Sequence, residues 1–156
     1  MSLVRKLLTH RYLAFAFRLY LGGLFIYASV YKIQYPAEFA EVIAGYQVVP
    51  FWLVNTMAVF MPWIELVTGL LLVAGVRSKS AILAIGVMLI MFTLALGYVI
   101  IAEIPIGCGC FTSLEDEVSW KTVVRDLTWL AMAVHVFFFD NVFHLENRYS
   151  WKVEEL

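Results

Sequence analysis

Two cysteines, Cys108 and Cys110, are separated by a single glycine in the segment IPIGCGCF, and the chain contains no others. The glycines before and between them permit the tight backbone turns that a bond between such close residues requires. A disulfide needs the two Cα atoms within about 6.8 Å, so this small ring is expected to be strained. Strained disulfides are the more oxidising, labile kind, and so short a loop contributes little entropic stabilisation. The pair therefore indicates thiol–disulfide exchange.

A neighbouring cation would lower the pKa of a cysteine thiol and raise its thiolate fraction. We expect Arg125 to be this cation, because the last hydrophobic segment begins near the cysteines, with Lys32 as the second candidate. Two thiolates alone do not complete a tetrahedral zinc site. We therefore expect the chain to have no metal centre. A Cu(I) site with Met61 as a further soft ligand stays open, and so does an inert cysteine pair.

The composition is that of a membrane protein. Of the 156 residues, 63% are hydrophobic and only 15% are charged, compared with about 45–50% and about 25% in soluble domains. A soluble protein of this size would expose large apolar patches and aggregate. The net charge is −1, and without a dense basic cluster nucleic acid is excluded as a partner. We expect membrane lipids around one domain that comprises residues 1–156.

Four segments approach the length of about 20 apolar residues that a membrane-spanning helix requires. They are residues 12–31, 51–76, 81–102 and 120–139. The sequence thus predicts an all-α integral membrane four-helix bundle. Arg5, Lys6 and Arg11 precede the first segment as they would in a signal peptide, but its length and the lack of a clear small-x-small cleavage site favour its retention.

Lysine and arginine are distributed unequally over the flanks of these segments. They cluster before the first span, in the turn that holds Arg77 and Lys79, and after the last span, whereas loops 32–50 and 103–119 carry mainly acidic charges. The positive-inside rule then predicts cytoplasmic N- and C-termini in a multi-pass inner-membrane protein. The cysteines would face the oxidising periplasm of a bacterium.

A short helix is expected between the first two spans, from Pro36 to Gly45, because proline suits a first helical turn and glycine ends a helix. Its apolar side chains recur at helical spacing opposite Glu38 and Glu41. That pattern fits either a helix in the membrane interface or a cap packed over the bundle.

Ionisable side chains within the spans are costly in lipid and usually face the bundle interior with a partner. At 1.5 Å per residue, Arg18 lies about 9 Å from the cytoplasmic side and Glu65 about 21 Å from the outer side, which is the same level in a core of about 30 Å. We predict an Arg18–Glu65 ion pair with His135 within reach. The pair could serve only to fix helix register, Arg18 could snorkel to the headgroups, and His135 could be an interior histidine or part of a proton relay.

Three polar stripes are predicted to converge on the interior, together with Asp126 as a further buried charge. The stripes are Arg18, Gly22, Phe25, Ser29 and Lys32 in the first span, Pro62, Glu65 and Gly69 in the second, and Lys121, Arg125, Thr128, Met132 and His135 in the fourth. Small residues in the first two stripes would let neighbouring helices approach closely.

The segments RLYLGGLFIYASVYKIQYPAEFAEVIAGYQVVP, MPWIELVTGLLLVAG, IPIGCGCF and VVRDLTWL, in this order, resemble the MauE/DoxX-like redox-associated membrane proteins over roughly residues 12–139. The matching positions are Arg18, Lys32, Pro62, Glu65, Cys108, Cys110, Arg125 and Asp126. The resemblance implies an inner-membrane bundle linked to thiol, disulfide or sulfur chemistry. Some members are tied to maturation of a disulfide-rich periplasmic dehydrogenase, and others to thiosulfate-to-quinone electron transfer.

The layout also looks like quinone-coupled disulfide-forming membrane proteins of the vitamin K epoxide reductase type. This chain differs from them in having Cys-x-Cys instead of Cys-x-x-Cys and no second cysteine pair. The reduced pair would therefore have to pass its electrons directly to a quinone.

The function expected from these features is that of a thiol–disulfide oxidoreductase acting on a periplasmic thiol or thioredoxin-fold protein. Arg125 would stabilise the leaving thiolate, and a quinone is the candidate electron acceptor, held near Phe111 and Trp120. Two alternatives stay open. The first is a non-catalytic subunit or assembly factor of a larger redox complex. The second is a transporter whose polar path is lined by Arg18, Glu65 and His135.

Overall fold

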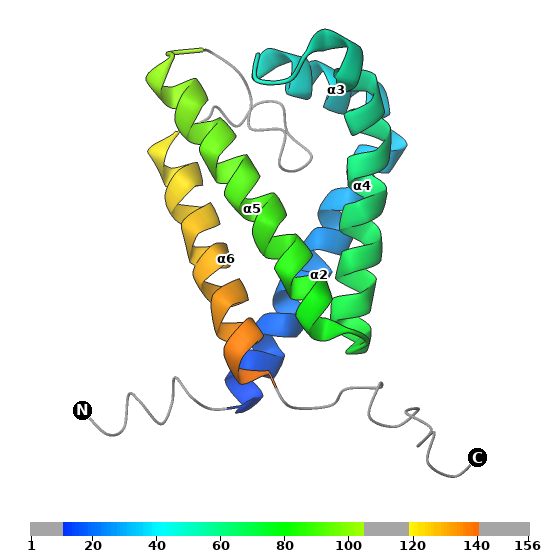
Figure 1. Cartoon of the computed structure of the whole chain (residues 1–156), viewed down its shortest axis with the longest axis vertical. Helices are drawn as coiled ribbons and strands as arrows, with labels where there is room; N and C mark the ends of the chain where they lie inside the picture. Colours follow the sequence, from blue (N-terminus) through cyan, green and yellow to red (C-terminus); the bar gives the residue numbers. More distant parts are fainter. Residues whose placement is uncertain (1–10, 105–118, 141–156) are drawn as a thin grey trace.

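The structure, a computed structural model, describes residues 11–104 and 119–140. Five helices and no strands occur in this part of the chain. They are α2 (Arg11–Gln34), α3 (Pro36–Gly45), α4 (Phe51–Ala74), α5 (Ser78–Ile101) and α6 (Trp120–Phe139) (Figure 1). All except α3 are long and apolar enough to cross a membrane. The predicted all-α, four-span fold is confirmed, and the chain is a multi-pass membrane protein.

The four long helices form a bundle in which α2 packs against α4 and α6, and α5 packs against α6 and α4. The starts of α2 and α5 and the ends of α4 and α6 lie at one end of the bundle, and α3 lies at the other (Figure 1). The turn between α4 and α5 depends on Gly75, whose φ of 70° is readily adopted by glycine at the end of a helix. From this turn α4 and α5 diverge toward the α3 end (Figure 1).

Helix α3 caps the open end of the bundle and has the predicted bounds. Phe39 and Ile43 pack with residues of α4, whereas Val42 and Tyr46 pack with residues of α5 and α6. The apolar face of α3 is therefore buried against the bundle itself. Of the two expectations for this helix, the packed cap is confirmed.

The bundle buries little of its apolar surface. Phe60, Leu94 and Phe138, for example, are 63, 69 and 68% exposed. Because lipid tails are as apolar as these side chains, a membrane helix gains nothing by burying them in protein. Close packing is concentrated instead in an interior that includes Leu21, Leu72 and several charged side chains.

Candidate functional site

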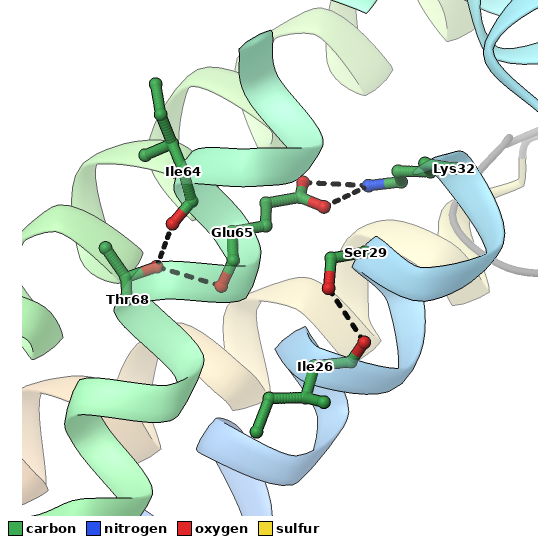
Figure 2. Close-up of polar contacts among 6 residues, drawn as sticks. All are labelled: Ile26, Ser29, Lys32, Ile64, Glu65 and Thr68. Carbon is green, nitrogen blue, oxygen red and sulfur yellow. Dashed lines mark hydrogen bonds and ion pairs between the residues drawn. The ribbon is translucent and has the colours of Figure 1, made fainter. Parts of the chain in front are cut away.

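Lys32 of α2 and Glu65 of α4 form a buried ion pair. The Lys32 Nζ donates hydrogen bonds of 2.8 and 2.9 Å to the two carboxylate oxygens of Glu65 (Figure 2). The nearby hydroxyls of Ser29 and Thr68 donate to backbone carbonyls of their own helices, so they do not compete for either charge (Figure 2). The ammonium and the carboxylate thus compensate one another inside the bundle.

The predicted Arg18–Glu65 ion pair is wrong, and the reason is the register between α2 and α4. These antiparallel helices meet at Gly22 and Gly69, where a Cβ on Gly22 would lie 3.1 Å from the carbonyl oxygen of Gly69. Arg18 lies one turn before Gly22, and Glu65 lies one turn before Gly69 on the oppositely directed helix. The two residues are therefore displaced in opposite directions, by about 12 Å in total along the bundle.

Arg18 instead pairs with Asp140 at the end of α6. Its Nη1 lies 3.1 and 3.3 Å from the two carboxylate oxygens of Asp140, and both side chains are almost fully buried. Sequence reasoning missed Asp140 because it follows the last apolar residue of the span. Asp140 follows Ala133 and Val136 at helical spacing, and both of those residues are buried. This spacing could have shown that Asp140 lies on the same inward face. His135 contacts the rings of Phe17 and Phe139 near this end.

The buried face of α6 differs from the predicted polar stripe. Asp126 is fully buried, whereas Arg125 is partly exposed and Lys121 and Thr128 are exposed. Adjacent helical residues lie about 100° apart, so Arg125 and Asp126 cannot both face the interior. The predicted stripe included Arg125, but Asp126 is the residue that is buried, together with Val123, Ala133 and Val136. The predicted stripes of α2 and α4 are buried as expected.

The two carboxylate oxygens of Asp126 differ in their hydrogen bonding. Its Oδ1 accepts hydrogen bonds of 3.3 Å from Nε and Nη2 of Arg125, whose guanidinium also lies 4.6 Å from the ring centroid of Trp129. Its Oδ2 is buried and has no hydrogen-bond partner among residues 11–104 and 119–140. A buried carboxylate oxygen without a hydrogen bond costs free energy. A further hydrogen-bond donor, such as a group on a ligand, could therefore bind to this oxygen.

A cavity of about 180 Å³ lies among all five helices toward the α3 end. The charged or polar side chains in its lining are Lys32, Glu65, Asp126 and Tyr46. The rest of the lining is apolar and rich in aromatic and methionine side chains: Leu24, Phe25, Ala28, Phe39, Val42, Ile43, Val48, Val49, Met57, Met61, Met88, Leu89, Met91, Phe92, Ala95 and Trp129. A mostly apolar pocket with a few convergent polar groups is the usual form of a ligand site.

Tyr46, the residue that follows α3, is buried and lines this cavity. Burial raises the pKa of its hydroxyl above the ordinary value, the negative charge of Asp126 raises it further, and Arg125 partly opposes the effect. Burial thus favours the neutral, protonated form of the Tyr46 hydroxyl.

The remaining residues predicted for the site are the two cysteines, Phe111 and Trp120. Cys108, Cys110 and Phe111 lie outside the described residues, so their placement stays a prediction. Trp120 begins α6, is 64% exposed and does not line the cavity. Within the described ranges, no three His, Cys, Asp or Glu side chains are grouped as a metal site requires.

The fold and site define a small multi-pass helical membrane protein with a charged cavity near one end of its bundle. The sequence profile described as methylamine utilisation protein MauE matches residues 10–139. This match covers most of the chain, which therefore belongs to the MauE family.

Two relatives are named methylamine utilization protein MauE. The protein of Paracoccus denitrificans is 31% identical over 123 residues, which are 78% of this chain and 66% of the relative. That of Methylorubrum extorquens is 28% identical over 101 residues, or 64% of this chain and 54% of the relative. The chain thus matches between about half and two thirds of the length of these relatives. No solved structure matches it.

Proposed function

We propose that this protein is a thiol–disulfide redox protein of the bacterial inner membrane that acts in methylamine utilisation. The names of its relatives support the process, and the Cys108–Gly109–Cys110 sequence supports the chemistry. The observation that carries the proposal is that the segment holding this pair joins the end of α5 to the start of α6, at the bundle end where the charged cavity lies.

Chain connectivity limits how far the cysteines can lie from that end. Ile104 packs against the cluster formed by Val42, Tyr46, Leu96, Val99 and Val123. Cys108 is four residues further along, and a chain extends by at most about 3.6 Å per residue. We therefore expect the cysteine pair to lie near the α3 end.

In the proposed reaction, a thiolate of a periplasmic thioredoxin-fold protein attacks one sulfur of the Cys108–Cys110 disulfide. A mixed disulfide forms and the other cysteine leaves as a thiolate, which Arg125, in the second turn of α6, would stabilise. The second thiol of the partner then attacks the mixed disulfide and releases the partner in its oxidised form. The reduced pair gives two electrons and two protons to a quinone, and its own disulfide is restored.

The distribution of charge supports a periplasmic position for the α3 end. The opposite end holds Arg77 and Lys79 at the turn between α4 and α5, whereas Glu38, Glu41 and Glu103 lie at the α3 end. By the positive-inside rule, the Arg77 end belongs in the cytoplasm together with both termini. The cysteines then face the compartment in which disulfides form.

The proposal is tested in proteoliposomes that contain the full chain, decylubiquinone and a reduced periplasmic thioredoxin-fold protein. Oxidation of the partner should be coupled to quinone reduction in a ratio of one to one, and Cys108→Ser should abolish both. Ser113→Ala changes the same segment without adding or removing a thiol and should retain activity. Wild-type rates in Cys108→Ser would refute the proposal.

A non-catalytic docking subunit is distinguished by co-purification in mild detergent. A stoichiometric partner that is retained equally by Cys108→Ser and Cys110→Ser, without quinone reduction by the wild type, would identify that role instead.

A further inference from the structure

The cavity near Asp126 opens toward lipid. Two of its lining side chains, Val48 and Met91, are 54 and 53% exposed, so the cavity reaches the surface between the α3–α4 connection and α5. Met91 lies near the middle of the membrane-spanning helix α5. At that depth the surrounding medium is hydrocarbon. A molecule dissolved in the bilayer can therefore enter, whereas a water-soluble one would have to cross lipid first.

The size of the cavity fits one substituted ring. An engineered protein cavity of about 150 Å³ is known to bind benzene, and this cavity has a volume of about 180 Å³. The remainder of a larger lipid-soluble molecule, such as an isoprenoid tail, would leave through the opening beside Met91.

The apolar lining suits a flat ring. Four of the six methionines of the chain line this cavity, namely Met57, Met61, Met88 and Met91. Methionine sulfur makes favourable contacts with aromatic rings, and its flexible side chain adapts to ring substituents. Phe92 and Trp129 add aromatic surfaces against which a ring can stack.

The polar groups in the lining suit a ring that carries oxygen atoms. Asp126 Oδ2 is a buried acceptor with no hydrogen-bond partner among the described residues. Lys32 Nζ uses two of its three N–H donors in hydrogen bonds to Glu65. The third can point into the cavity or toward the ring of Phe39, whose centroid lies 4.9 Å from Nζ. A quinone carbonyl can accept from Lys32, and a quinol hydroxyl can donate to Asp126. An acyl chain could do neither.

We infer that this cavity is the binding site for the head ring of a membrane quinone, which enters from the lipid beside Met91 and is held by contacts to Asp126 and Lys32. The inference deepens the proposed function and rests on it for the electron donor. In the complete step, two thiols and one quinone give one disulfide and one quinol. The thiols lose two electrons and two protons, and the two ring oxygens gain the protons.

Equilibrium binding of tritiated decylubiquinone to the full chain in nanodiscs tests the site. The Cys108→Ser/Cys110→Ser protein should bind the probe with the affinity of the wild type, because binding does not require the cysteines. Ala95→Phe fills the cavity and should weaken binding about tenfold or more, since the interior has no room for a second ring. Ala131→Phe places the same ring on the exposed face of α6 and should leave binding unchanged.

Two further variants keep the test decisive if Ala95→Phe fails to fold. Met91→Trp changes a half-exposed side chain at the opening and should slow association of the probe. Asp126→Leu removes the unpartnered acceptor and should weaken binding of decylubiquinol about tenfold, the loss expected for a hydrogen bond to a charged group.

The inference is overturned if folded Ala95→Phe binds decylubiquinone with wild-type affinity, or if folded Met91→Trp associates with it at the wild-type rate. Retention of a phospholipid in the cavity with no binding of decylubiquinone would overturn it as well. Failure of the proposed function has a different signature. If the probe binds and the cavity variants weaken it, but reduced Cys108 and Cys110 never reduce the bound quinone, the site stands and the redox role falls.

Discussion

The Lys32 ammonium lies 2.8 and 2.9 Å from the two carboxylate oxygens of Glu65, so a single contact between α2 and α4 compensates both buried charges. Removing one member leaves the other charge uncompensated in the interior. We expect Glu65→Gln and Lys32→Met each to lower the free energy of unfolding by about 3–5 kcal/mol, as is typical of a broken buried ion pair. The measurement is unfolding in mixed micelles of increasing denaturing detergent content.

The double variant Lys32→Met/Glu65→Met provides the control for that pair. Because neither charge is then buried, it should recover most of the stability that the single variants lose. If the double variant is as unstable as the sum of the two single variants, the two side chains do not interact in the way the structure describes.

The contact between Gly22 and Gly69 sets the register of α2 and α4. A Cβ at Gly22 would lie 2.6 Å from Val73 Cγ2, and one at Gly69 would lie 3.0 Å from the carbonyl oxygen of Gly22. Gly22→Ala and Gly69→Ala should destabilise the bundle by about 1–3 kcal/mol through overpacking. Gly23→Ala, where a Cβ meets nothing within 4 Å, is the matched control and should not destabilise it.

The clash at Gly22 can also be relieved. Val73→Ala removes the methyl group that the new Cβ would meet, so Gly22→Ala/Val73→Ala should be more stable than Gly22→Ala alone. The same measurement in mixed micelles applies, and equal stability of Gly22→Ala and Gly23→Ala would contradict the close approach.

The first-span stripe and the bounds of α3 could be predicted from sequence because each depends on local chemistry. Pro36 and Gly45 mark the ends of a helix wherever it packs, and a repeat of three and four residues defines one helical face. The register between helices is not local in this sense. It follows from the contact between Gly22 and Gly69, and a depth estimate from span ends alone misplaced Arg18 relative to Glu65 by about 12 Å.

The site was harder to predict than the fold. Asp126 was expected to be buried, and it is, but the predicted stripe of this span was placed through its neighbour Arg125, which is partly exposed. Asp140 escaped notice because a charge after a span is normally solvated. The cavity itself depends on how α4 and α5 diverge beneath α3, which no single segment encodes.

Arg18 and Asp140 tie the start of α2 to the end of α6, far from the cavity. Asp140→Asn should therefore lower stability by about 3–5 kcal/mol, because it removes the carboxylate charge from a buried ion pair whose atoms lie 3.1 Å apart. The affinity for decylubiquinone in the fraction that stays folded should not change, because neither residue lines the cavity. A loss of affinity at unchanged stability would contradict the separation of the two sites.

The raised pKa of Tyr46 predicts a dependence of stability on alkaline pH. Above the ordinary tyrosine pKa of about 10, the unfolded chain releases a proton that the folded protein keeps at this position. Stability should therefore fall as pH rises, with a contribution from Tyr46 of at most about 1.4 kcal/mol per pH unit. Tyr46→Phe should have a shallower slope between about pH 10 and 11.5, and an identical slope would show that Tyr46 ionises normally.

The proposed orientation can be mapped with single cysteines in a Cys108→Ser/Cys110→Ser background. Glu41→Cys and Lys79→Cys change exposed residues at opposite ends of the bundle. In intact spheroplasts, a membrane-impermeant maleimide should label position 41 and should reach position 79 only after lysis. The reverse pattern would place the α3 end in the cytoplasm.

Maleimide trapping of the native protein is the most direct test of the redox account, since the chain contains only two cysteines. When the protein is isolated in acid, which protonates thiols and stops their exchange, it should take up no maleimide before reduction. After reduction it should take up two maleimide molecules per chain. Addition of the reduced partner should expose the two thiols, and decylubiquinone should close them again. Two thiols that are free from the outset and indifferent to both partner and quinone would contradict the account.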